Sequence, residues 1–181
     1  MTAYTHNEQT IVRRIMVVCK VGILDKDIDQ EKGVKALWDT GAMCTCISLK
    51  LADMLGLQPD DYGLVNGANN QPFQAPIYSV QLKMGHFSIP YLRVYGLPMD
   101  GQENDVIIGM DVMVKGDLSI TNYEGKTVLT FREPSIATID YVADLKKYNE
   151  MRARYLKSKI EKCPCGSGKL WKNCHGKASL T

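Results

Sequence analysis

Short apolar segments separated by turn residues run through the first 135 residues and predict a mainly β domain. Segments rich in β-branched and apolar residues, bounded by Gly, Pro, Asn or Asp, are typical of strands. The predicted strands cover residues 15–24, 34–38, 77–84, 87–95, 106–108, 118–121 and 127–131. The Gly85-His86 and Glu124-Gly125 pairs predict hairpin turns. Residues 1–10 are polar, so we expect a loose N-terminal segment.

Two short helices are predicted inside this β-rich region. Ser48 can cap the first helix, and Gly56 marks its end. Ile47, Leu51 and Leu55 recur four residues apart, which gives this helix one apolar face. The second short helix is expected over residues 110–115, which Gly116 ends.

The pattern changes after Pro134, where residues 136–162 contain no glycine. Apolar side chains recur there at helical spacing, which predicts one long helix. They are Val142, Leu145, Tyr148, Met151 and Tyr155. We therefore divide the chain into a β domain (1–135), a helical basic linker (136–162) and a cysteine-containing tail (163–176).

Charge is distributed unevenly between these parts. Residues 1–143 hold 12 Lys or Arg and 17 Asp or Glu, whereas residues 144–181 hold 10 and 3. An acidic body followed by a basic end indicates modules with different partners. The basic helix could contact RNA or an acidic protein surface, although a solvated lysine-rich helix is the commoner reason for such a charge run.

The apolar segments are too short for a membrane span. The longest near the start of the chain is residues 15–19, far below the roughly 20 residues that a spanning helix needs. We expect a cytoplasmic protein without a membrane partner. Its six cysteines then indicate metal binding or burial rather than disulfides.

An aspartate follows the second predicted strand in the sequence Asp39-Thr40-Gly41-Ala42. A carboxylate that activates water needs a rigid turn. Gly41 allows a close backbone approach, and the Thr40 hydroxyl is expected to make a buried hydrogen bond that holds the loop. An inactive barrel with a tight Asp-Thr-Gly turn is the alternative interpretation.

This loop resembles the catalytic loop of the retropepsins, the retroviral-like aspartic proteases. Ile107-Ile108-Gly109 resembles their late apolar strand and glycine, and the resemblance covers about residues 15–131. It implies a retropepsin-like closed β-barrel or sandwich with short helices, in which Asp39, Thr40 and Gly41 are catalytic.

The resemblance also implies a flap over residues 63–76, with substrate contacts at Ala42, Asn66 and Gly67. One departure concerns an Arg–Asp pair present in some retroviral members. Met110 and Cys44 occupy those positions here.

The retropepsin mechanism needs two carboxylates that share a proton. This sequence has a single Asp-Thr-Gly, and its other aspartates lack that context. The second carboxylate must come from a second copy, so we expect a twofold homodimer with Asp39 opposite Asp39.

The tail contains the sequence Cys163-Pro-Cys165-Gly-Ser-Gly-Lys-Leu-Trp-Lys-Asn-Cys174-His175. It resembles the SEC-C motif of the bacterial preprotein translocase ATPase, where the motif serves partner binding. Cys163, Cys165, Cys174 and His175 supply three sulfurs and one nitrogen, a set that suits a closed structural zinc site.

Together these features predict an aspartic endopeptidase that cleaves extended peptides and carries a zinc tail for recruiting a partner or substrate. The peptidase itself needs no cofactor. Two alternatives stay open. One is a non-catalytic peptide-binding adaptor, and the other is a nucleic-acid- or ribosome-associated protein that uses the basic zinc tail.

Overall fold

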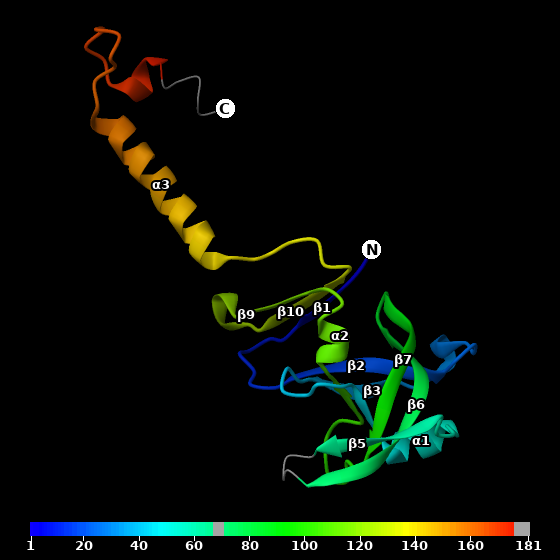
Figure 1. Cartoon of the computed structure of the whole chain (residues 1–181). Coiled ribbons are helices and arrows are strands. Elements are labelled where there is room, and N and C mark those ends of the chain that lie inside the picture. Colours follow the sequence, from blue (N-terminus) through cyan, green and yellow to red (C-terminus); the bar gives the residue numbers. More distant parts are fainter. Residues whose placement is uncertain (67–70, 176–181) are drawn as a thin grey trace. The chain divides into compact units, whose positions relative to one another are not determined.

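The computed structural model describes residues 1–66 and 71–175, and of residues 157–160 it describes the backbone alone. The chain forms two compact units, Met1–Ala137 and Thr138–Thr181. The first contains all the strands and the second contains the long helix and the tail (Figure 1). No described helix has both the length and the apolar character needed to cross a membrane.

Six strands of the first unit close into a barrel (Figure 1). They are β2 (Ile15–Ile23), β3 (Val34–Trp38), β8 (Val106–Ile108), β4 (Cys46–Ser48), β7 (Phe87–Leu97) and β6 (Pro72–Met84) in sheet order. An antiparallel pairing of β2 with β6 closes the ring. The mainly β fold with a closed barrel is therefore confirmed.

Alternation of side chains along the strands builds the core. In β2, Ile15, Val17, Cys19 and Val21 are buried, and the intervening residues are more exposed. This follows from the two-residue period of a strand, which sends successive side chains to opposite faces.

A smaller three-stranded sheet in the order β1–β10–β9 packs beside the barrel. Its strands are β1 (Thr2–Asn7), β9 (Asp117–Thr121) and β10 (Val128–Glu133). Phe131 of β10 joins it to the barrel, because its ring centroid lies 5.5 Å from Trp38 and 5.3 Å from Phe87. The expectation of a loose N-terminal segment was wrong, since β1 pairs along its whole length with β10.

The predicted short helices are present. α1 (Leu49–Leu55) begins at Ser48, whose hydroxyl accepts a hydrogen bond from the Leu51 N–H, and ends at Gly56 with a left-handed φ of 65°. α2 (Met110–Met113) follows Gly109. The remaining helices are α3 (Tyr141–Ile160) and three short 3₁₀ turns, η1 (Ile28–Gln30), η2 (Tyr123–Gly125) and η3 (Trp171–Asn173).

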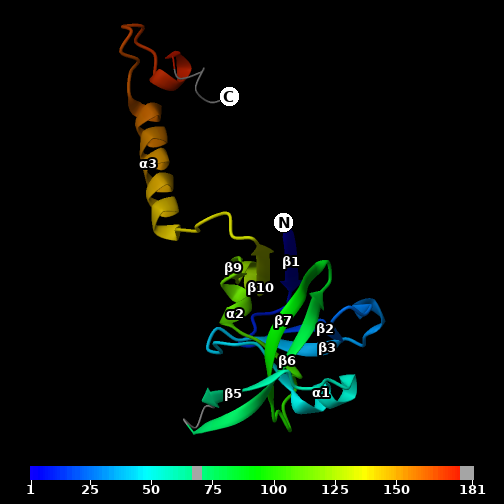
Figure 2. The same ribbon diagram turned by 45° about the vertical axis from the view of Figure 1, so that its right-hand side comes forward.

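The segment expected to be a flap forms a hairpin. β5 (Asp61–Asn66) pairs with β6 from Asp61–Ile77 to Asn66–Pro72. β5 is an edge strand, attached to the barrel through β6. Both views place this hairpin and the three-stranded sheet at opposite ends of the first unit (Figures 1 and 2).

Candidate active site and metal site

Asp39 lies directly after β3, where a parallel pairing with β8 fixes the backbone. Trp38 pairs with Ile108, and the Asp39 N–H donates a 3.0 Å hydrogen bond to the Ile108 carbonyl. This pairing brings two segments nearly 70 residues apart together. The two motifs noted in the sequence are therefore neighbours.

The loop after Asp39 holds the carboxylate in place. The Gly41 N–H donates a 2.8 Å hydrogen bond to Oδ1 of Asp39, and the Ala42 N–H donates to the Asp39 carbonyl at 3.2 Å. This N–H bond fixes the orientation of the carboxylate. Asp39 is half-buried.

Gly109 allows the second segment to lie against this loop. A Cβ at this position would lie 2.5 Å from the Cys44 carbonyl carbon and 3.0 Å from the Ala42 carbonyl oxygen. The backbone then continues the contact, because the Met110 N–H donates to the Ala42 carbonyl at 2.8 Å. Glycine is needed here because a side chain would collide with the facing backbone. The φ of Gly109, −96°, would by itself allow other residues.

Thr45 connects the two segments through its side chain. Its hydroxyl donates a 2.7 Å hydrogen bond to Oδ1 of Asp111 and accepts one of 3.1 Å from the Gly109 N–H. Thr45 is fully buried. No local pattern in the sequence reveals this role of Thr45, because both of its partners lie more than 60 positions away.

Thr40 differs from the expectation. The predicted buried bond of its hydroxyl is absent, because the residue is exposed. Within the described part of the chain, this hydroxyl has no hydrogen-bond partner. The neighbouring Met43 is also exposed, with 80% of its surface accessible.

Two cysteines near the loop, Cys44 and Cys46, have raised thiol pKa values, whereas reactive thiols have lowered ones. Burial raises the pKa of the Cys46 thiol to about 12, and the charges of Cys44 and Asp111 add to the effect. Burial, followed by the Asp111 charge, also raises the pKa of Cys44. Since the thiolate is the reactive form, both side chains are expected to stay protonated and unreactive near neutral pH.

Asn66, which is expected at the flap, lies on the hairpin of β5 and β6. Asn66 is exposed at the end of β5, and no hydrogen bond joins it to the Asp39 loop among the described residues. Gly67 lies outside the described residues. The suggested substrate contacts at Ala42, Asn66 and Gly67 therefore stay a prediction.

In the second unit, the SEC-C-like tail folds as a small hairpin. Lys162 forms a bridge with Leu170, and the Cys163 N–H donates to the Lys169 carbonyl at 2.7 Å. The turn between them uses Gly166 and Gly168 at φ values of 79° and 67°, which favour glycine.

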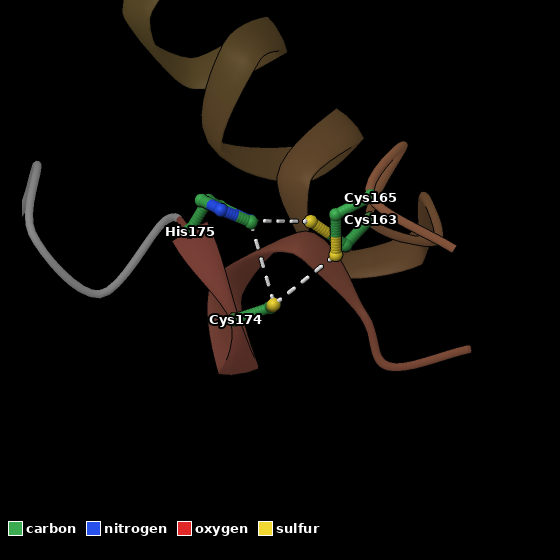
Figure 3. A group of neighbouring side chains, drawn as sticks. All are labelled: Cys163, Cys165, Cys174 and His175. Carbon is green, nitrogen blue, oxygen red and sulfur yellow. Dashed lines mark hydrogen bonds between the residues drawn. The ribbon is translucent and has the colours of Figure 1, made fainter. Parts of the chain in front are cut away.

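This hairpin gathers the four proposed metal ligands (Figure 3). Their ligand atoms all lie within 4.8 Å of one another. Nδ1 of His175 lies 3.1 Å from the sulfur of Cys163 and 3.5 Å from that of Cys174, and the sulfurs of Cys165 and Cys174 are 3.6 Å apart.

Two of these separations, 3.5 Å and 3.6 Å, match a tetrahedral zinc site, and the 3.1 Å contact is shorter than such a site needs. Zinc bonds of about 2.3 Å to sulfur and about 2.0 Å to nitrogen place neighbouring ligand atoms roughly 3.5–3.8 Å apart. Hydrogen bonds, first from the Cys165 backbone, lower the pKa of the Cys163 thiol to about 7 and so favour the thiolate that binds metal. The residues present are compatible with zinc.

Comparisons with solved structures give remote similarities. A retropepsin-like aspartic protease from Rickettsia conorii is 12% identical, with 73% of this chain and 94% of that chain covered and a TM-score of 0.49. The EIAV protease bound to the inhibitor HBY-793 is 16% identical, with coverage of 56% and 86% and a TM-score of 0.40. The retroviral protease-like domain of Ddi1 from Leishmania major is 16% identical, with coverage of 72% and 99% and a TM-score of 0.40.

Comparisons with family models are more direct. Residues 25–112 match the model described as aspartyl protease, and residues 161–177 match the SEC-C motif. No curated protein matches the sequence. The matched segments contain the Asp39 loop, Gly109 and all four tail ligands. The resemblances noted in the sequence are therefore confirmed: residues 25–112 are similar to aspartyl proteases, and residues 161–177 are similar to the SEC-C motif.

Proposed function

We propose that the protein is an aspartic endopeptidase whose active site forms between two copies of the chain. The observation that carries this proposal is the half-buried Asp39, whose carboxylate is held by the Gly41 N–H in the segment that matches the aspartyl protease model. Each chain has a single Asp-Thr-Gly sequence. A twofold dimer supplies the second carboxylate.

The proposed mechanism divides two roles between the Asp39 carboxyls. Two adjacent carboxyls cannot both ionise readily, so the pair holds one proton. The ionised carboxylate takes a proton from water, and the protonated partner donates its proton to the carbonyl oxygen of the scissile peptide. Because the pair titrates as a unit, hydrolysis is faster at acidic than at alkaline pH.

Substrate binding in this proposal uses the exposed edge at β5. An extended peptide can add to a strand edge through backbone hydrogen bonds, while alternate side chains enter pockets. Ala42, Asn66 and Gly67 contact the peptide in this arrangement. Thr40 is exposed in the single chain, which is consistent with a contact that only a second copy completes.

The decisive experiment replaces the proposed base. Asp39→Asn keeps the size of the side chain but cannot accept the proton from water, so peptide hydrolysis is expected to fall to background while the melting temperature changes little. Asp100→Asn, on an exposed loop, is the matched control and keeps full activity. Full hydrolysis by folded Asp39→Asn protein would exclude this mechanism.

A mixing experiment tests the shared site. Adding excess Asp39→Asn protein to the wild-type chain produces mixed dimers that hold one aspartate, so activity is expected to fall below the value for simple dilution. Specific activity also falls when the total concentration drops below the dimer dissociation constant. Activity that is proportional to wild-type chain at every dilution and mixture contradicts the dimer.

Two other functions are separated by the same tests. A peptide-binding adaptor binds peptides equally well with Asp39 or its replacement, and hydrolyses none. A nucleic-acid- or ribosome-associated protein, suggested by the basic residues after position 143, shows salt-sensitive binding through residues 136–181. In every case we propose that zinc in the tail is structural and that the protein is cytoplasmic.

A further inference from the structure

One face of α3 exposes a stripe of apolar side chains. The exposed fractions are 59% for Leu145, 56% for Tyr148 and 63% for Met151, and Tyr141 is also exposed. Residues three and four positions apart share a face of a helix, so these side chains form one continuous surface centred on Tyr148. A helix with such a stripe normally packs it against another element.

The sequence of α3 is self-complementary about Tyr148. Three positions before it is Leu145 and three after is Met151, and both are apolar. Four positions before it is Asp144 and four after is Arg152, and these have opposite charges. Neither Asp144 nor Arg152 takes part in an ion pair with another described residue.

This symmetry has a direct meaning for twofold pairing. In an antiparallel helix pair with its axis at Tyr148, each residue before Tyr148 faces the residue equally far after it in the second copy. A twofold interface requires such self-complementarity, since residue i contacts j and j contacts i. A parallel pair would instead bring Asp144 beside Asp144 and Arg152 beside Arg152.

We propose that α3 is a dimerisation surface that pairs antiparallel with α3 of a second copy of this chain. Tyr148 then lies on the twofold axis and contacts its own equivalent. Leu145 packs against Met151 of the second copy, and Asp144 forms an ion pair with Arg152 of the second copy, twice by symmetry. Tyr141 faces the position of Tyr155, whose ring is about half exposed.

The pairing is expected to be weak by itself and useful in the whole chain. A single pair of 20-residue helices buries little surface, and exposed ion pairs add little affinity. A second contact within one dimer acts at a high effective concentration, so it strengthens any contact made by the β domains. The proposal does not require peptidase activity.

Charge reversal in the full chain provides the test, with dimer dissociation measured by analytical ultracentrifugation. Asp144→Arg alone and Arg152→Asp alone each place like charges opposite one another twice, so each is expected to weaken the dimer by roughly tenfold. The combined swap D144R/R152D restores opposite charges and returns the affinity close to that of the wild type. A mixture of the two single variants is also expected to form heterodimers more tightly than either forms homodimers.

A matched control uses the other side of the same helix. Glu150 lies two residues from Tyr148, which turns it about 200° away, so Glu150→Arg leaves dimerisation unchanged. Disulfide trapping gives a second readout, because Tyr148→Cys crosslinks two chains at the axis and Glu150→Cys does not. Asp39→Asn protein dimerises normally in all these tests, which separates this proposal from the proposed peptidase.

Three results would overturn the helix pairing. One is wild-type affinity in both single charge variants, as expected if an acidic partner rather than a second copy covers α3. Another is a combined swap no tighter than the single variants. The third is a full chain that stays monomeric at every concentration.

Discussion

At the scale of single residues, Thr45 stabilises the structure around the proposed active site, although it has no proposed part in the chemistry. Its buried hydroxyl bonds both the Gly109 N–H, after β8, and the Asp111 carboxylate, at the start of α2. A buried N–H or carboxylate oxygen that loses its partner costs about 1–3 kcal/mol. Thr45 therefore positions the loop of Asp39 without touching a substrate.

Thr45→Val tests this role, because valine matches the shape of threonine and removes the hydroxyl. We expect the free energy of unfolding to fall by about 2 kcal/mol, because the Gly109 N–H is then buried without an acceptor. Thr45→Ser keeps the hydroxyl and loses one methyl group, so it costs about 1 kcal/mol and preserves activity. Denaturant unfolding of both variants measures the difference, and equal losses would mean that packing alone explains Thr45.

The chemical motifs could be recognised in the sequence, but the residues that hold them in place could not. Asp39-Thr40-Gly41 and the four tail ligands stand out because their spacing is local. The roles of Thr45 and of the Gly109 contact depend on residues brought together by strand pairing over more than 60 positions, which no local pattern encodes. The Thr40 expectation was wrong for a single chain because the loop faces outward.

At the scale of elements, Asp117 fastens the start of β9 to β10 and to the segment that follows it. Its carboxylate accepts hydrogen bonds from the Ile136 N–H at 3.0 Å, from the Ser135 hydroxyl, and from Arg132 Nε at 3.0 Å. These bonds, in that order of effect, hold the pKa of Asp117 well below its usual value. The ionised carboxylate of Asp117 therefore stabilises the folded chain.

The pH dependence of stability follows from that shift. A carboxyl whose pKa is depressed by folding stabilises the protein above its unfolded pKa of about 4, and this contribution disappears as the pH falls towards the folded value. Asp117→Asn should therefore lower the melting temperature at pH 7, and the gap to the wild type should narrow on acidification below about pH 4. Asp100→Asn is the control without these bonds. A gap of constant size from pH 7 to pH 2 would contradict the assignment.

The hairpin of residues 161–175 is a second element with a testable requirement. It is too small to bury a core, so bound metal is expected to fold it. Metal analysis should find one zinc per chain, and Cys174→Ala should reduce that content to background. Cys44→Ala, which changes a cysteine outside the cluster, leaves zinc unchanged. Zinc-free wild-type protein with a protease-resistant tail would show that the hairpin folds without metal.

Elements with local signals were predicted well. Ser48 and Gly56 bound α1 as capping chemistry requires, and the apolar strands of the barrel match their expected places. β1, β4 and β5 were not predicted as strands, and β6 begins five residues before its predicted start. β1 is polar and is stabilised by pairing with β10, more than 120 residues away, while β4 has three residues and is defined by its neighbours β7 and β8.

At the scale of the whole molecule, the two units have different proposed roles. The family match to aspartyl proteases ends at residue 112, and the proposed catalytic groups all lie in the first unit. The four tail ligands would fill a tetrahedral zinc site and leave no position for a water molecule. Zinc in the tail therefore has no expected role in bond cleavage.

We propose that the tail recruits a partner or substrate, which makes the effect of its removal predictable. Residues 144–181 hold 10 basic and 3 acidic residues, so this end of the chain attracts acidic partners more strongly than the acidic first unit. A protein lacking residues 163–181 should stay dimeric and cleave a short unstructured peptide at the wild-type rate. It should lose its preference for a protein substrate that the full chain selects.

Two further variants distinguish loss of the metal-binding motif from the shortening of the chain. Removal of residues 177–181 alone keeps all four ligands and should preserve selectivity, whereas Cys165→Ala in the full chain should lose selectivity as the longer deletion does. Peptide rate, dimer affinity and competition between substrates are measured for all three proteins. Because α3 remains in each of them, dimerisation through that helix is unaffected. If the deletion of residues 163–181 instead dissolves the dimer or abolishes peptide cleavage, the tail belongs to the catalytic assembly and the recruitment proposal is wrong.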